Sequence, residues 1–326
     1  MLIWLVLIPL IAAALIGLCK APARPTALLS ASLTLALGIW ALVSFDGCSS
    51  CWSRFEGMDL QLTLAPALSK VMLLLTILVT FATVLGTNPP QGGEASWYNS
   101  ALLISAGATG AFLSDNIISF FAFHELALIP TFVMIGLYGR GDRRTTAWRA
   151  TLYLGLASMV LLAALLMIGT QAGFTFSGLK DFMASGRELA HAELIGALLI
   201  AGFGTLISLF PFHSWAAPAY ASAPAPVAMM HAGVLKKFGL YGLFMFQPLM
   251  ETGFLPWTNI LLVLLVCNVI WVGYVTVNQK RLDLLLGNSS VMHMGYIFLA
   301  FAALVVSGSA EANPWALKGA ALLMLA

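Results

Sequence analysis

The stretch PVAMMHAGVLKKFGLYGLFMFQ, Pro226 to Gln247, decides the fold class of this chain. About 20 helical residues cross a membrane, and these 22 residues carry charge only at Lys236 and Lys237. At about 1.5 Å per residue, Lys237 would lie about 16 Å along such a helix, near the middle of the bilayer. An ionisable group at that depth indicates a functional site, and the alternative is a lysine that packs or extends to the surface.

The rest of the chain has the same apolar character. Of the 326 residues 60% are hydrophobic and 9% are charged, and apolar runs recur along the whole length. This composition predicts an all-α membrane protein, a polytopic helical bundle, forming a single domain over residues 1–326. The net charge of +2 argues against a nucleic-acid partner.

The apolar runs predict ten transmembrane helices and the beginning of an eleventh. The ten runs cover residues 2–19, 26–44, 66–87, 97–113, 116–138, 148–170, 192–210, 226–247, 256–277 and 284–306. The eleventh begins near Pro314 and reaches only Ala326, which predicts a truncated C-terminus. The seventh run breaks at Pro211, and the prolines after it predict an interrupted helix, with a simple cytoplasmic loop as the alternative.

Basic residues predict the orientation. They gather in alternate loops, at Lys20 and Arg24, at Arg140, Arg143, Arg144 and Arg149, and at Lys280 and Arg281. Because basic loops stay in the cytoplasm, the N-terminus is expected on the periplasmic side.

A second intramembrane charge is predicted at Glu125, nine residues after Asn116. Each unpaired charge costs about 2.5 to 3.5 kcal/mol on insertion scales, so Glu125 and the two lysines require pairing, neutralisation or water. Together with His213 and His231 they predict a proton relay, and a structural ion pair is the alternative. Lys236 and Lys237 point about 100° apart on a helix, so they cannot share one narrow face.

The cysteines do not predict a metal site. Cys48 and Cys51 form a C-S-S-C spacing in a predicted outer loop, and no second pair is suitably placed. A local disulfide or two idle thiols are the expectations.

Several motifs in order resemble the antiporter-like subunits of respiratory complex I, especially those of the NADH-quinone oxidoreductase subunit M (chain 4) type. They are DNIISFFAFHELALIPTFVMIGLYG from Asp115, PFHSWAAPAYASAPAP from Pro211, HAGVLKKFGLYG from His231 and NSSVMHMGYIFLA from Asn288. The resemblance covers residues 115–326, and the first hundred residues match only in hydropathy. The family continues with several more helices, so the second half of its usual channel is expected to be absent.

The resemblance implies roles for individual residues. Glu125 matches the family's glutamate of the fifth helix, and Lys237 matches its lysine of the eighth. Lys236 is an extra lysine, and Leu206 stands where the family has the lysine of the seventh helix. The loss of that lysine removes the usual partner of the glutamate, unless Lys236 or Lys237 takes its place.

The function implied is a proton-translocating membrane-arm subunit of NADH-quinone oxidoreductase in the bacterial inner (plasma) membrane. Other membrane-arm subunits are the implied partners. No cofactor or metal is expected in this chain, because the resemblance places NADH, FMN, iron-sulfur clusters and quinone in the assembly. The alternatives are a subunit of a multi-protein Na⁺/H⁺ antiporter, a subunit of a membrane-bound hydrogenase, and a structural homologue that does not pump.

Overall fold

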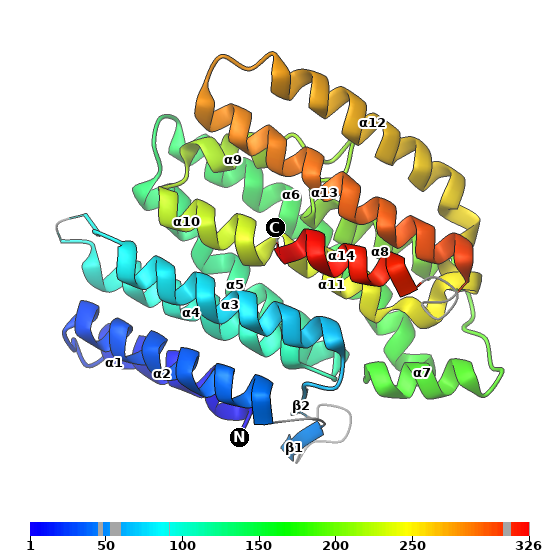
Figure 1. Cartoon of the computed structure of the whole chain (residues 1–326), viewed down its shortest axis with the longest axis horizontal. Coiled ribbons are helices and arrows are strands. Elements are labelled where there is room, and N and C mark those ends of the chain that lie inside the picture. The colour runs from blue at the N-terminus through cyan, green and yellow to red at the C-terminus, as the bar shows by residue number, and fades with distance from the viewer. Residues whose placement is uncertain (45–47, 53–59, 91, 309–313, 326) are drawn as a thin grey trace. The chain divides into compact units, whose positions relative to one another are not determined.

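The computed structural model describes residues 1–44, 48–52, 60–90, 92–308 and 314–325, and most of them are helical (Figure 1). The chain divides into two compact units. Unit 1 comprises Met1–Arg144 and Ala223–Leu235, and unit 2 comprises Thr145–Ser222 and Lys236–Ala326.

Unit 1 is built from helices and one short hairpin. Its elements are α1 (Ile3–Gly17), α2 (Ala23–Ser44), β1 (Cys48–Trp52), β2 (Leu60–Thr63), α3 (Ala67–Gly86), α4 (Glu94–Leu113), α5 (Ile117–Tyr138), α10 (Ala225–Met230) and the π-helix η1 (His231–Leu235). β1 pairs antiparallel with β2, and Cys51 lies opposite Gln61. The expectation for the thiols of Cys48 and Cys51 concerns side chains outside the described part of the structure.

α4 is the central helix of unit 1. It packs against α1, α2, α3 and α5, and nearly all of its residues from Trp97 onward are buried. Glycines set the approach to α5, because a Cβ at Gly107 would lie 2.6 Å from the carbonyl oxygen of Phe123.

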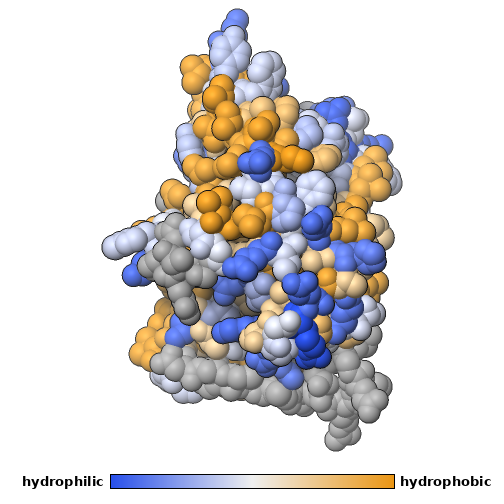
Figure 2. Space-filling model, turned by 90° about the vertical axis from the view of Figure 1, so that its right-hand side faces the viewer, coloured by the Kyte–Doolittle hydropathy of each residue, from blue (hydrophilic) through white to orange (hydrophobic). Residues whose placement is uncertain are grey.

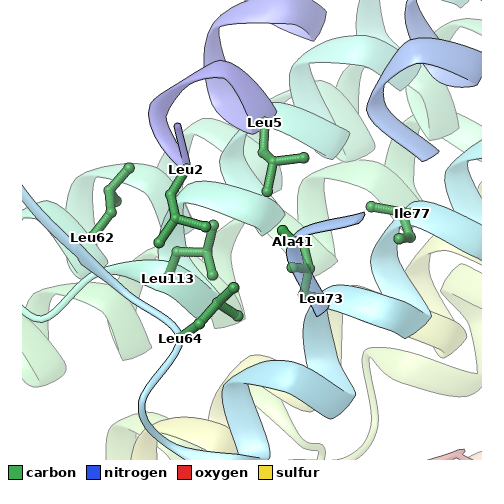
Figure 3. Close-up of a cluster of buried hydrophobic side chains, with 8 residues drawn as sticks. All are labelled: Leu2, Leu5, Ala41, Leu62, Leu64, Leu73, Ile77 and Leu113. Atoms are coloured by element: carbon green, nitrogen blue, oxygen red, sulfur yellow. The ribbon is translucent and has the colours of Figure 1, made fainter. Parts of the chain in front are cut away.

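A leucine-rich cluster closes one end of unit 1. Its buried members are Leu2, Leu5, Ala41, Leu62, Leu64, Leu73, Ile77 and Leu113 (Figure 3). These side chains come from the N-terminal segment with α1, from α2, α3 and α4, and from the segment around β2, so the cluster holds the N-terminal helices against α3 and α4.

Unit 2 is also helical. Its elements are α6 (Arg143–Ala172), α7 (Phe176–Ala184), α8 (Ala192–Leu206), α9 (Ala216–Ser222), α11 (Lys237–Met245), the short helices η2 (Gln247–Leu249), η3 (Met250–Phe254) and η4 (Leu255–Trp257), α12 (Thr258–Val277), α13 (Leu282–Ser307) and α14 (Pro314–Leu325). The bounds of α6 overlap unit 1 by two residues.

The surface of α12 shows the membrane character most plainly. Large apolar side chains stand exposed at helical spacing on this helix: Ile260, Val263, Val266, Ile270, Trp271, Tyr274 and Val277. Water would not favour such a stripe, whereas lipid does. In Figure 2 hydrophobic side chains likewise lie at the surface, among hydrophilic ones.

Six helical segments among the described residues are long and apolar enough to cross a membrane. They are Ala23–Ser44, Ala67–Gly86, Ile117–Tyr138, Arg143–Ala172, Gln247–Val277 and Leu282–Ser307, and Ile3–Gly17 and Ala192–Leu206 are shorter apolar helices. The helical membrane class is therefore confirmed, while the count of ten to eleven crossings stays a prediction.

The predicted helix over residues 226–247 is found as a continuous helical path over residues 225–245, but not as a regular α-helix. The run divides into α10, the π-helix η1 and α11, and the boundary between the two units falls inside it, after Leu235. A π-turn adds a residue to the turn and shifts every later side chain around the axis, so positions counted on a regular helix do not hold beyond it.

One loop prediction was wrong in part. Arg143, Arg144 and Arg149 lie in the first turns of α6, because that helix extends beyond its apolar part. The segment after α6 contains the short helix α7, whose N-cap Thr175 accepts a hydrogen bond from the Gly178 N–H.

Candidate functional site

Glu125 lies on α5 beside a histidine. α5 begins where Asn116 Oδ1 accepts hydrogen bonds from the N–H groups of Ile118 and Ser119, at 2.9 and 3.0 Å. His124 Nδ1 lies 3.2 Å from Glu125 Oε1, and the imidazole is fully buried whereas the carboxylate side chain is 31% exposed. A buried imidazole thus lies beside a carboxylate that is partly accessible.

The same unit places His231 close to α5. His231 is buried and opens η1, which packs against α3 and α5. Gly233 permits that packing, since a Cβ there would lie 3.1 Å from Val79 Cγ2 on α3. Unit 1 thus gathers two of the predicted relay residues, Glu125 and His231, on elements in contact.

Lys236 is the most enclosed of the predicted residues. Only 1% of it is exposed, and its Nζ lies 3.5 Å from Ser290 Oγ on α13. The same Nζ lies 5.0 Å from the centroid of the Tyr220 ring on α9, and the Tyr220 and Ser290 hydroxyls are hydrogen-bonded. A hydroxyl oxygen and an aromatic face both stabilise an ammonium group.

Lys237 has different surroundings. It is buried and opens α11, which packs against α8 and α13. The approach to α8 is close because a Cβ at Gly239 would lie 2.7 Å from the Phe203 carbonyl oxygen and 3.4 Å from Leu206 Cβ. Leu206 is buried there and fills space between the helices.

The predicted break at Pro211 is confirmed. α8 ends at Leu206, Ser208 has a φ of 64°, and the helical path resumes at Ala216. Asn268 on α12 holds the break, because its Oδ1 accepts the Phe210 N–H and its Nδ2 donates to the Val291 carbonyl, both at 3.1 Å. Trp215 Nε1 donates to the Thr205 carbonyl at 3.2 Å, which satisfies a group at the end of α8.

His213 lies in this break. Its ring stacks on Phe210 with 5.4 Å between centroids, and it is hydrogen-bonded to the backbone of Pro211. Lys236 is close enough for an electrostatic interaction with the imidazole. Unit 2 therefore brings His213 and Lys236 together, whereas Glu125 and His231 belong to unit 1.

Three polar residues were missed by the sequence interpretation: Tyr220, Asn268 and Ser290. Asn268 is an amide in the middle of the apolar run of α12, and Ser290 lies in the polar triplet Asn288–Ser290 inside α13. Both signals were visible in the sequence. His293, in contrast, is exposed and bonds to its own helix at the Ser289 carbonyl.

The described residues contain no group of three or more His, Cys, Asp or Glu side chains that could hold a metal ion. Cys19 and Cys267 have free thiols. The ionisable groups of the site therefore stand among hydroxyls, amides and aromatic rings.

The apolar helices are irregular at two places, after α8 and before α11, and they enclose lysines and histidines. These features define a polytopic membrane protein with ionisable groups inside its bundle. The chain belongs to the NADH:quinone oxidoreductase/Mrp antiporter transmembrane family, whose model matches residues 114–325. This match confirms the resemblance seen in the motifs.

Curated relatives carry the same family assignment. The chain is 32% identical over 265 residues to NAD(P)H-quinone oxidoreductase chain 4 2 of Microcystis aeruginosa, covering 79% of this chain and 46% of the relative. It is 30% identical over 259 residues to chain 4-2 of Synechocystis sp., covering 79% and 45%. The chain spans about half the length of the curated relatives it matches.

Solved structures share the fold over the whole chain. A chain of respiratory complex I from Thermus thermophilus with bound NADH matches with a TM-score of 0.82 and 25% identity, over 100% of this chain and 70% of that one. A chain of the Mrp complex from Dietzia sp. matches with a TM-score of 0.84 and 21% identity, over 99% and 36%. The N-terminal helices thus belong to the shared fold, although their motifs are not distinctive.

Proposed function

We propose that this chain is a proton-translocating membrane-arm subunit of an NAD(P)H-quinone oxidoreductase. The supporting observation is that two lysines lie buried directly after a π-helical turn, in a family whose curated relatives are named NAD(P)H-quinone oxidoreductase chain 4. A π-turn inside a helix is frequently found at a functional site, and an ionisable group buried among transmembrane helices indicates a path for protons or ions.

Within this proposal, Glu125, Lys236, Lys237, His213 and His231 form the relay. Electron transfer takes place in partner subunits that hold NADH, FMN, iron-sulfur clusters and quinone, and this chain contributes no redox step. Membrane-arm subunits are its partners and the lipid bilayer surrounds it.

The proposal includes the topology. The chain forms a single transmembrane domain with ten to eleven crossings in the bacterial inner membrane. The N-terminus lies on the periplasmic side, because the basic segments around Lys20, Arg140 and Lys280 then face the cytoplasm.

Cation/proton exchange is a second candidate function. It is favoured by the fold match to the Mrp complex and by the family itself, which includes Mrp antiporters. Replacing Na⁺ by K⁺ in the assay separates the two functions, because only a sodium-coupled exchanger loses transport.

The test places Glu125→Gln and Lys237→Ala separately in the assembled complex in inverted membrane vesicles. Proton uptake is measured per quinone reduced, with NADH as electron donor. Both variants should lose about tenfold in uptake per electron, because a relay lacking one proton-binding group is interrupted. Lys280→Ala, which changes an exposed lysine, serves as the control and should leave uptake unchanged.

Unchanged uptake per electron in both variants, with normal assembly, would instead show that Glu125 and Lys237 are structural. The chain would then be a scaffold that does not pump.

A further inference from the structure

Lys236 ends between two helices of unit 2 that come into close contact. A Cβ at Gly287 on α13 would lie 3.0 Å from both Cα and the carbonyl oxygen of Ala217 on α9. Such a distance means that the helices meet backbone to backbone at this point. Three residues further along each helix stand Ser290 and Tyr220, which lie on the faces that meet.

This packing builds a closed polar cluster. The Tyr220 and Ser290 hydroxyls are hydrogen-bonded, Lys236 Nζ donates to Ser290 Oγ at 3.5 Å, and the Tyr220 ring lies 5.0 Å from the same nitrogen. Lys236 is 1% exposed, so bulk water does not solvate its charge.

No carboxylate neutralises Lys236 within the part of the chain that the structure describes. A structural ion pair therefore does not account for its position. A lysine that served only as packing could be replaced by an apolar side chain without the cost of burying a charge.

We propose that Tyr220 and Ser290 are positioning residues for Lys236, and that this cluster makes Lys236 a second charged station of the relay beside Lys237. The ring face of Tyr220 stabilises the ammonium form, and Ser290 Oγ fixes the direction of its N–H bonds. This inference rests on the proposed function.

The two contributions of Tyr220 can be separated by substitution in the assembled complex. Tyr220→Leu removes the ring, whereas Tyr220→Phe keeps the ring and removes the hydroxyl. Proton uptake per quinone reduced should fall about fivefold in Tyr220→Leu and in Lys236→Leu, and Tyr220→Phe should keep most of it. Proton uptake per quinone reduced should fall less in Ser290→Ala than in Tyr220→Leu. Ser290→Thr, which keeps the hydroxyl, should retain the uptake that Ser290→Ala loses.

The double variant Lys236→Leu with Tyr220→Leu tests whether the two residues act as one. If Tyr220 acts through Lys236, the double variant is no worse than Lys236→Leu alone. Equal losses in Tyr220→Phe and Tyr220→Leu, or losses that multiply in the double variant, would overturn the inference. Quinone reduction and the amount of assembled complex on a native gel identify any variant that merely misfolds. If Tyr220→Leu or Lys236→Leu misfolds, the difference in uptake between Ser290→Ala and Ser290→Thr decides whether the cluster acts on Lys236.

The outcome also separates this inference from the proposed function. If Lys237→Ala abolishes uptake while Lys236→Leu and Tyr220→Leu preserve it, only the role of the cluster is rejected. If Lys237→Ala preserves uptake as well, the proposed function itself fails.

Discussion

The two helix breaks differ in what produces them. The break after α8 contains Pro211 and is held by side-chain hydrogen bonds from Asn268 and Trp215. The break between α10 and α11 is a distortion of a helical path that continues through it, and a π-helix with Gly233 and no proline forms it. Proline forces the first break, whereas close packing allows the second, and the second carries the lysines.

The comparison predicts different weak points. Where close packing at a glycine sets the geometry, added side-chain volume should destabilise the fold. Where hydrogen bonds set the geometry, the loss of a donor or an acceptor should destabilise it.

The largest effect is expected at Gly239, on the lysine side of the second break. Gly239→Leu places Cβ 2.6 Å from Ile207 Cγ2 and 2.7 Å from the Phe203 carbonyl oxygen, so α11 must move away from α8. Overpacking of this kind costs about 3 kcal/mol in the free energy of unfolding. The measurement is the thermal unfolding midpoint of the full chain in detergent, by circular dichroism. Gly155→Leu on α6, where nothing lies within 4 Å of the added Cβ, is the control and should melt like the parent protein.

A smaller effect is expected at Asn268. Asn268→Leu leaves the Phe210 N–H without its acceptor, which costs about 1 to 3 kcal/mol, whereas the Val291 carbonyl lies inside α13 and keeps the bond of its own helix. The thermal unfolding midpoint should fall by less than it does in Gly239→Leu. In limited proteolysis, cleavage near Pro211 should occur earlier than in the parent protein. Asn278→Leu, at the exposed end of α12, is the matched control. A cut pattern identical to the parent's would show that Pro211 maintains the break without Asn268.

The smallest effect is expected at Trp215. Trp215→Phe keeps most of the ring volume and removes the hydrogen bond from Nε1 to the Thr205 carbonyl, for about 1 kcal/mol. The unfolding midpoint in detergent should drop slightly. Trp257→Phe, which loses a solvent-exposed hydrogen bond to the Glu193 carbonyl, is the control against which this drop is measured. A larger loss than in Asn268→Leu would reverse the order of importance at this break.

The sequence predicted the first break and not the second, for a physical reason. Pro211 restricts its own backbone and that of the residue before it, so its effect can be recognised locally. The π-helix at His231 has no proline to mark it, and it depends on the packing of Gly233 against Val79, which only the folded chain defines.

The candidate site shows the same limit. Burial of Lys236 and Lys237 followed from their apolar neighbours, and the structure agrees. The contacts of Lys236 did not follow, because Tyr220 and Ser290 lie 16 and 54 positions away along the chain and meet it only through the contact at Gly287. The full burial of His124 beside Glu125 did not follow either, because it depends on how α5 packs.

The apolar stripe on α12 links the first break to the thickness of the membrane. From Ile260 to Val277 it spans about 26 Å at the helical rise, close to a hydrocarbon core of about 30 Å. Asn268 stands near the centre of that span, on the side of the helix away from lipid. A bilayer of shorter acyl chains, with a hydrocarbon core thinner than this stripe, would therefore tilt α12, and that tilt would displace the backbone of Phe210 through its bond to Asn268. Acyl-chain length is thus a physical variable to which this helix break should respond.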